Sequence, residues 1–488
     1  MSDKQDGALK KGRLGILGIV FFVVAASAPL VGMTGAVPVA IGAGNGAAAS
    51  GTYLLVGLLL LVFSVGFTRM SREVTNTGAF FAYVGRGLGK EAGVGSAFAS
   101  LVGYLTIQLA IYGFFGGLLA LSVPNSLPWW GWAIAGWIVV TGLSLLSVDV
   151  GAKVLGVLMI LELLSLVIMA IGIFAKGGPE GLNFAASFSP EAIFAGGLVG
   201  GAGIAIAFAF ASFIGFEATA IYGEEAKDPK RAVPRATYWA IGIITGLFTF
   251  VSFAVVTGLG ATDIANKVGE MSEGLTNPAA VIFGLANDNV GPWLAWCMEW
   301  LVVSSLFAGL LAFQNAAARY FFALGRGGVL PGSLSKTNSS GAPVNGIVVT
   351  SSIALLVIAA FAVQGLDGIG NLFFWMSAVT AVAIIFVEIL VSLAILVYFT
   401  KNKGANIWQG KIAPAVALLG LLAGEYLLMS RFNLLGGLAP TPEEAGNPWA
   451  LSTLGWVLVL LPFVAAVVGV IWGRMSGANS KATADVLS

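Results

Sequence analysis

Apolar stretches of about 20 residues recur along the whole chain. As a helix, one such stretch is long enough to cross the ~30 Å hydrocarbon core of a bilayer. Only 10% of the 488 residues are charged, whereas a soluble domain carries about a quarter. A membrane β-barrel would instead show segments of ~10 residues with alternating polarity. The sequence therefore predicts an all-α protein that crosses the membrane many times.

We predict twelve membrane spans, with tails at residues 1–13 and 474–488. If the N-terminus is inside, all but three of the 24 basic residues lie in inner segments, in agreement with the positive-inside rule. The three exceptions are Lys176, Lys267 and Arg431. This distribution predicts a multi-pass protein of the cell membrane with both termini in the cytoplasm. The predicted spans are 14–44, 51–69, 92–122, 129–147, 152–175, 194–222, 236–261, 291–324, 344–363, 368–399, 411–430 and 451–473.

An inverted repeat would relate residues 14–175, with spans 1 to 5, to residues 194–399, with spans 6 to 10. Spans 11 and 12, residues 411–473, would lie outside it. Because five is an odd number, the two halves would face opposite ways, and spans 1 and 6 would be counterparts. Both contain helix-breaking residues: span 1 reads SAPLVGMTGAVP at 27–38, and span 6 reads ASFIGFEATA at 211–220. Matched interruptions in two halves indicate a substrate site.

Unwound backbone inside a membrane is tolerated where it lines a cavity or meets a ligand. The N-terminal end of a half-helix attracts an anion, and the C-terminal end attracts a cation. The two breaks therefore suit a zwitterion, with N–H groups near Thr34 and Gly35 for its carboxylate. Carbonyl groups near 28–31 and 210–213 would receive its ammonium group. The alternative is that glycine and proline only kink two packed helices.

Three stretches resemble the amino acid–polyamine–organocation (APC) permeases. FIGFEATAIYGEEAKDPKRAVPRA at 213–236 is similar to the span-6 signature of that superfamily. TNTGAFFAYVGRGLGKEAG at 75–93 resembles its loop after span 2, and NAAARYFFALGRGGVLP at 315–331 resembles its end of span 8. The resemblance covers roughly residues 14–400. It departs in span 1, where VGMTGAVP replaces the usual Gly-Ser-Gly before the proline, so it leaves the substrate class open.

The resemblance implies the leucine-transporter fold, a 5+5 inverted repeat with alternating access around a central site between spans 1, 3, 6, 8 and 10. Phe208 and Phe373 are candidate aromatic lids of that site. Tyr104, Gln108 and Tyr112 of span 3 share one helix face, which borders the path or forms a packing seam. We expect the substrate to contact Ala28, Val31, Gly32, Met33, Thr34, Gly35, Gln108, Phe210, Ser212, Phe213, Gly215, Phe313 and Trp375.

Two acidic residues lie in apolar surroundings, Glu217 beside the span-6 break and Glu162 in span 5. A charge at bilayer depth costs about 2.5 kcal/mol or more, so it is usually functional or paired. We expect Glu217 to link protonation to the opening of span 6, or to cap the second half-helix. We expect Glu162 to accept a coupling proton, to bind a cation with Ser304 or Ser305, or to make a packing hydrogen bond. The resemblance implies a lysine near Glu162 in proton-coupled members, so the acid is a departure.

Further charged residues have weaker functional signals. Glu299, Glu388 and Glu425 lie in spans 8, 10 and 11, where an interhelical hydrogen bond or contact with water would explain each. Glu225 and Arg235 follow span 6, in a segment predicted to be a cytoplasmic loop. They are candidates for inner-gate contacts, and the alternative is a solvated loop that obeys the positive-inside rule.

The sequence thus predicts a secondary transporter that imports an amino acid or related amine, by proton symport in preference to sodium symport or uncoupled exchange. With no histidine and a single cysteine, Cys297, the chain offers no internal disulfide and no cluster typical of an enzyme site. No selectivity loop of a channel is visible. GAGNG at 42–46 follows a membrane helix and not a strand, so it does not indicate a dinucleotide-binding site.

We expect no cofactor, metal or nucleic acid. The expected partners are the substrate, a proton or sodium ion, and lipid, with the protein as a monomer or homodimer.

Overall fold

The computed structural model describes residues 15–74, 79–123, 127–146, 150–197, 200–221, 226–338 and 341–475. All regular secondary-structure elements in this part of the chain are helices. The tail at 1–13, Glu225 and all but the first residues of the tail at 474–488 lie outside the described residues.

The first half of the chain runs from an interrupted helical region to the long helices α6, α7 and α8, with the short helix α5 before α6. Its elements are α1 (Ile16–Ala26), α2 (Pro29–Val31), η1 (Gly32–Ala36), α3 (Val37–Val39), η2 (Ala40–Asn45), η3 (Gly46–Ala48), α4 (Ala49–Met70), α5 (Ala79–Leu88), α6 (Lys90–Ser122), α7 (Trp129–Leu146) and α8 (Val150–Lys176).

The second half alternates long helices with short ones. Its elements are α9 (Phe184–Phe188), α10 (Pro190–Ile193), α11 (Ala202–Phe213), α12 (Ala218–Ile221), α13 (Pro229–Leu259), α14 (Ile264–Met271), α15 (Ala279–Asn289), α16 (Pro292–Arg326), η6 (Gly332–Ser335), α17 (Val344–Val363), η7 (Gly368–Phe373), α18 (Phe374–Lys401), η8 (Trp408–Ile412), α19 (Ala413–Ser430), η9 (Phe432–Leu434), η10 (Pro442–Gly446) and α20 (Thr453–Met475).

Ten helical stretches of the described chain are long and apolar enough to cross a membrane. One of them, Ile16–Met70, contains the predicted spans 1 and 2. The predicted span 6 is divided between α11 and the short α12, so neither part reaches the length of a span. The all-helical, multi-pass prediction is confirmed, while the count of twelve stays a prediction.

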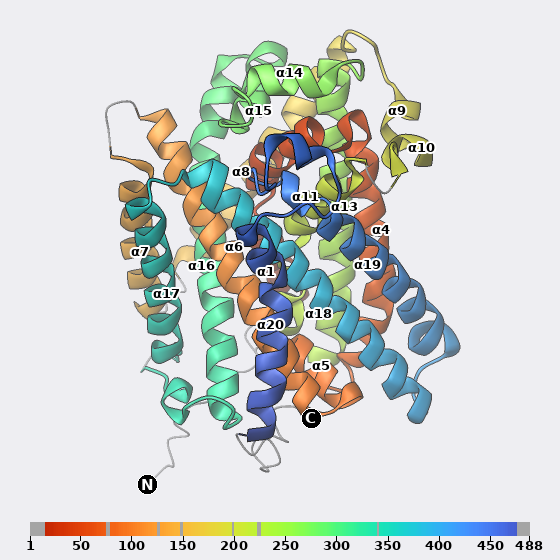
Figure 1. Cartoon of the computed structure of the whole chain (residues 1–488), viewed down its shortest axis with the longest axis vertical. Coiled ribbons are helices and arrows are strands. Elements are labelled where there is room, and N and C mark those ends of the chain that lie inside the picture. Colours follow the sequence, from red (N-terminus) through yellow and green to blue (C-terminus); the bar gives the residue numbers. More distant parts are fainter. Residues whose placement is uncertain are drawn as a thin grey trace.

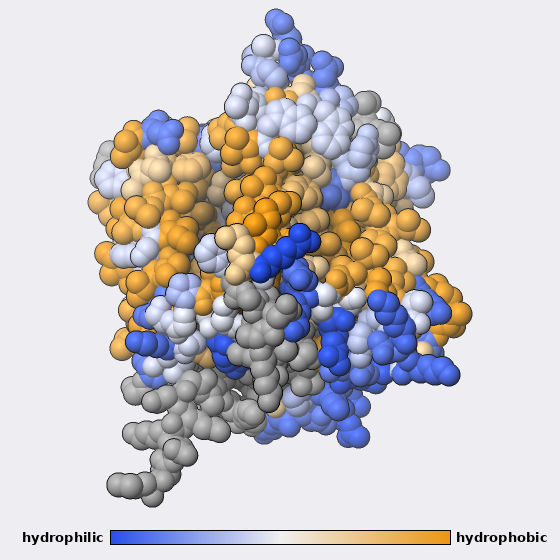
Figure 2. Space-filling model, turned by 60° about the horizontal axis from the view of Figure 1, so that its bottom comes forward, coloured by the Kyte–Doolittle hydropathy of each residue, from blue (hydrophilic) through white to orange (hydrophobic). Residues whose placement is uncertain are grey.

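The bundle has two different ends. The short helices α9, α10, α14 and α15 lie together at one end, and α5 lies at the other (Figure 1). Figure 2, which brings the end with α5 forward, shows an apolar belt with hydrophilic residues gathered below it. Large apolar side chains such as those of Leu356 and Val467 are exposed on the outside of the bundle. Lipid tails solvate such side chains, so their exposure is expected in a protein that spans the bilayer.

The middle of the bundle is formed by α6 and α18. α6 packs against α5, α7, α16, α18 and α20 and is buried along most of its length. A helix that is apolar on every side is suited to this central position. The Thr106 hydroxyl of α6 and the Thr380 hydroxyl of α18 lie 2.7 Å apart and form a hydrogen bond. This bond joins the two central helices inside the apolar core.

The charged segment after span 6 differs from the expectation of a loop. α13 begins at Pro229, well before the predicted start of span 7. Proline suits the first position of a helix because the N–H that it lacks would have no partner there. The predicted gate residue Arg235 is therefore helical, and its side chain is exposed on the early part of α13.

The last two helices pack closely on the rest of the bundle. A Cβ atom on Gly469 of α20 would lie 2.9 Å from the Cα of Gly95 on α6. A Cβ on Gly203 of α11 would overlap the carbonyl oxygen of Leu427 on α19. Small residues at such crossings let two membrane helices approach to backbone contact. α19 and α20 therefore contact helices from both halves of the preceding chain.

Candidate functional site

The first predicted break occurs between α1 and α2. α1 ends at Ala26, and Ala28 adopts a left-handed conformation with φ 42° and ψ 68°. Pro29 then starts a new helix, in which the N–H of Gly32 donates to the Ala28 carbonyl at 3.1 Å. Non-glycine residues rarely adopt this conformation, and such strain is often found at functional sites. Two π-helical turns, η1 and η2, follow in the same span, a feature also frequent at functional sites.

The second predicted break separates α11 from α12. α11 ends at Phe213, Ile214 is extended with ψ 134°, and Gly215 has a φ of 114°. A side chain is strained at that φ, so glycine is the residue that this turn requires. The helix resumes at Ala218 for one turn.

The two breaks lie against each other. A Cβ on Gly215 would be 3.0 Å from the Cβ of Ala26 and 3.5 Å from the backbone nitrogen of Ser27. Residues that are almost 190 positions apart thus bring two unwound segments into contact. The interrupted helices therefore share one polar backbone region inside the bundle.

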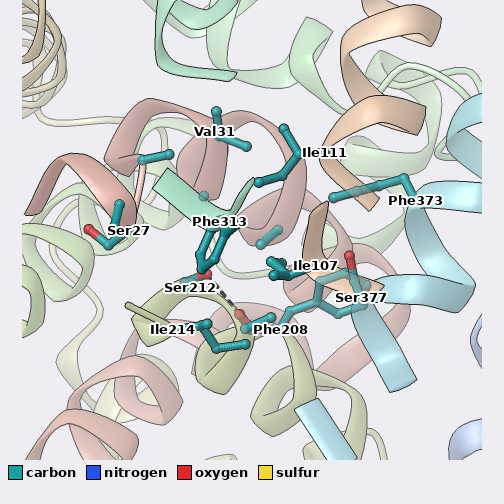
Figure 3. Close-up of a pocket in the computed structure, with 15 residues that line it drawn as sticks. Ser27, Val31, Ile107, Ile111, Phe208, Ser212, Ile214, Phe313, Phe373 and Ser377 are labelled. Atoms are coloured by element: carbon teal, nitrogen blue, oxygen red, sulfur yellow. Dashed lines mark hydrogen bonds between the residues drawn. The ribbon is translucent and has the colours of Figure 1, made fainter. Parts of the chain in front are cut away.

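A small cavity lies next to this contact. The centres of water-sized molecules can occupy about 50 Å³ of it, whereas one buried water needs about 10–15 Å³. Figure 3 shows side chains of the neighbouring helices turned toward this space. The cavity is lined by Ala26, Ser27, Ala28, Val31, Gly32, Ala36, Ile107, Ile111, Phe208, Ala211, Ser212, Ile214, Phe313, Phe373 and Ser377.

The lining is apolar apart from three hydroxyl groups. Ser27 donates to the Val24 carbonyl at 2.8 Å, and Ser212 donates to the Phe208 carbonyl at 2.7 Å (Figure 3). The third hydroxyl belongs to Ser377. None of the fifteen lining residues is charged, so any charge on a ligand must be met by backbone dipoles at the helix ends.

Five predicted substrate residues line the cavity, and eight do not. The lining includes Ala28, Val31, Gly32, Ser212 and Phe313. The remaining eight are Met33, Thr34, Gly35, Gln108, Phe210, Phe213, Gly215 and Trp375, which are not part of the lining.

The residues outside the lining have identifiable partners. The Thr34 hydroxyl donates to the Leu30 carbonyl at 2.7 Å, and the indole N–H of Trp375 donates to the Gly436 carbonyl at 3.0 Å. Gln108 donates to Gln314 on α16. Thr34 lies within the π-helical turn η1, because the new helix starts earlier, at Pro29. The first N–H groups of this new helix, which have no partner within it, are therefore those that follow Pro29. They lie several residues before the predicted position near Thr34 and Gly35.

Sequence reasoning missed several lining residues. Ser27 and Ala26 precede the expected break, and Ser377 lies two positions after the predicted Trp375. Ile107 and Ile111 occupy neighbouring positions to the polar stripe of span 3, so the cavity lies beside that stripe. The spacing of Ile107 and Ile111, four residues apart, is a signal that they share a helix face.

Glu217 is completely buried beside the break in span 6. Its Oε1 accepts a hydrogen bond from the Tyr104 hydroxyl at 3.0 Å, and its Oε2 accepts one from the Gly215 N–H at 2.9 Å. The carboxylate therefore fixes the unwound turn from within and connects it to α6. The backbone donor belongs to the break and not to α12, so the capping of the second half-helix stays a prediction.

Glu162 lies between α8 and α16, away from the cavity lining. Its side chain is 3% exposed, and the Ser304 hydroxyl donates to its Oε1 at 3.4 Å. The Ser305 hydroxyl is close to the same carboxylate but forms no hydrogen bond of good geometry. The structure thus brings together the three residues that the sequence grouped.

Comparison with known proteins identifies a family. The family described as amino acid permease matches residues 14–459 of the chain.

Individual relatives are more distant. The chain is 24% identical over 366 residues to the probable amino-acid permease meu22 of Schizosaccharomyces pombe, which covers 71% of this chain and 61% of that protein. It is 30% identical over 156 residues to the branched-chain amino acid permease BcaP of Lactococcus lactis, with 32% of this chain and 31% of that protein covered. It is 26% identical over 257 residues to the aromatic amino acid permease FywP of the same species, with 52% of this chain and 50% of that protein covered. The chain thus spans less than two thirds of the length of each of these relatives.

Proposed function

Because the chain belongs to the amino acid permease family, we propose that it is a secondary transporter that imports an amino acid or related amine by alternating access. The observation that carries the proposal is the contact between the two helix breaks beside a small internal cavity. Two interrupted helices that meet beside a cavity supply unpaired backbone groups where a substrate could bind. We further propose that it acts in the cell membrane with both termini in the cytoplasm, as the distribution of basic residues favours.

The helix ends supply the groups that would bind the two charges of an amino acid. The first N–H groups after Pro29 lack partners within their helix and suit the α-carboxylate. The carbonyl ends of α1 and α11 lie on the other side of the breaks and suit the α-ammonium group. This arrangement needs no charged side chain, in agreement with the lining.

The remaining walls favour an uncharged side chain on the substrate. Ile107, Ile111, Phe208, Phe313 and Phe373 present apolar surface to the cavity. A cationic or anionic side chain would lose water there without gaining a partner. Two of the relatives are named for branched-chain and aromatic amino acids, which supports a neutral apolar substrate for this chain.

Phe313→Ala should change which amino acids are preferred. The ring forms part of the wall, so its removal leaves room for a larger side chain. We expect the ratio of kcat/KM for aromatic over small amino acids to rise by about tenfold, the lower part of the range for a change in pocket size. Competition uptake into proteoliposomes measures this ratio. Phe210→Ala is the matched control, because Phe210 is buried outside the lining. An equal change in both variants would contradict the assignment of Phe313.

Proton coupling through Glu162 is the form of energy coupling that we propose, with sodium symport and uncoupled exchange as alternatives. Uptake of a pooled panel of labelled amino acids and polyamines, with pH gradient and sodium varied separately, tests transport and coupling together. In the wild type, uptake should follow the pH gradient. In Glu162→Gln it should lose that dependence but keep exchange across equal pH. Uptake that follows sodium, or an unaltered Glu162→Gln, would overturn this assignment.

A further inference from the structure

Two buried acidic side chains lie outside the cavity and have incomplete hydrogen bonding. Glu388 on α18 is 1% exposed, and Glu425 on α19 is 6% exposed. Oε2 of Glu388 and both carboxyl oxygens of Glu425 have no hydrogen-bond partner among the described residues. A carboxyl group in this position has lost its water without gaining donors, which is costly. Burial without donors disfavours the ionised form of both groups most strongly.

Glu425 lies at the junction of α11, α18 and α19. These three helices pack against one another. A Cβ on Gly424, the preceding residue, would lie 3.5 Å from the ring of Phe210 on α11. α11 is the helix that ends at the break of span 6.

Glu388 lies on the part of α18 that faces α6. A Cβ on Gly103 of α6 would lie 2.9 Å from Ile384, which is one turn before Glu388. The next residue on α6 is Tyr104, whose hydroxyl binds Glu217. Glu388 is therefore close to the carboxylate that holds the break, although it is on a different helix.

The charges near Glu388 do not neutralise it. The groups whose charges act on it are Glu217 and Glu425, and both are acidic. Tyr104 and Tyr320 are the titratable groups that face Glu217 from α6 and α16. Three ionised carboxylates close together in a medium of low dielectric would repel one another strongly. At least some of them must be neutral for this packing to persist.

We propose that Glu388 and Glu425 form a proton-binding site at the junction of α11, α18 and α19, separate from Glu162 and from the substrate cavity. A bound proton removes the negative charge and converts one acceptor oxygen into an O–H donor. The Ser392 hydroxyl, one turn after Glu388, is also buried and has no partner in the part of the chain that the structure describes. If a proton passes between this site and Glu217, one protonated carboxyl group becomes a carboxylate and the other carboxylate becomes protonated. The total charge of the three residues is then unchanged.

Infrared difference spectroscopy of the reconstituted full-length protein tests the proposal directly. The C=O stretching band of a protonated carboxyl group should be present at pH 7 and should shift on transfer to D₂O. Glu388→Gln and Glu425→Gln should each remove one component of this band. Glu191→Gln, on the exposed helix α10, is the matched control and should leave the band unchanged.

The melting temperatures of the same variants provide a second, independent readout of the proposal. Glutamine has the shape of a protonated glutamic acid, so both glutamine variants should melt at or above the wild-type temperature. A carboxyl band that is identical in all three variants and the wild type would overturn the proposal. So would glutamine variants that unfold well below the wild type, because they would show that an ionised carboxylate is required. Neither readout depends on transport, so the proposal can fail or succeed independently of the proposed function.

Discussion

Replacement of Glu217 by alanine should be among the most damaging single changes in this protein. The Tyr104 O–H and the Gly215 N–H would both lose their acceptor while remaining buried. An unsatisfied buried donor costs about 1–3 kcal/mol, so the free energy of unfolding should fall by about 2–6 kcal/mol. The turn at Gly215 would also lose its tether. We expect uptake to fall by about tenfold or more, since 1.4 kcal/mol of lost preorganisation already corresponds to that factor.

Graded variants separate the contributions of the two oxygens. Glu217→Gln keeps one acceptor and places an NH₂ group against the other donor, so its thermal unfolding should lie between those of wild type and Glu217→Ala. Tyr104→Phe removes one donor and should be milder than Glu217→Ala. The double variant Tyr104→Phe with Glu217→Ala should cost less than the sum of the single changes, because the two groups are partners. Additive effects would show that the hydrogen bond between them is unimportant.

Gly215→Ala should impair transport through the backbone of the break. The φ of 114° at this position is strained for alanine, at a cost of about 1–3 kcal/mol. The new methyl group would also lie 3.0 Å from the Cβ of Ala26 and press the two unwound segments apart. We expect a lower melting temperature and strongly reduced uptake in proteoliposomes.

The matched control is Gly246→Ala in the middle of α13. A Cβ there has no atom within 4 Å, and alanine in a helix interior is favoured over glycine by about 0.5–1 kcal/mol. This variant should be as active as the wild type and at least as stable. Adding Ala26→Gly to Gly215→Ala should relieve the steric part of the defect and leave the part due to φ. Complete rescue would mean that φ is not limiting, and wild-type behaviour of Gly215→Ala would refute both arguments.

The long helices could be predicted from the sequence because each needs only a local property, an apolar run of sufficient length. The short helices α5, α9, α10, α14 and α15 were not predicted, since they are too short and too polar to produce such a run. The boundary of α13 was also misplaced, because charged residues before a span look like a loop. Pro229 was the signal that a helix begins there.

The position of the breaks was predictable in part. Proline and glycine identified both interrupted spans. In span 1, however, the backbone leaves the helical conformation at Ala28, a residue with no helix-breaking tendency of its own. The following Pro29 disfavours the right-handed helical conformation in the residue before it, which explains why the helix is interrupted there but not why Ala28 is left-handed. Which side chains line the cavity depends on how five helices meet, so Ile111 and Ser377 could not be distinguished from core residues by composition.

The close crossing of Gly95 and Gly469 has a consequence for dividing this chain. If the predicted inverted repeat of ten spans is present, the last two helices would lie outside it, yet α20 touches the backbone of α6 and α19 touches that of α11. Truncation before α19 would uncover both glycine faces and open Glu425's junction to lipid. Coexpression of residues 1–400 with 401–488 as two separate chains should instead allow the helices to reassociate in the membrane. These contacts indicate that the working unit of this protein is the complete set of helices, and we expect that the C-terminal pair can be supplied as a separate chain.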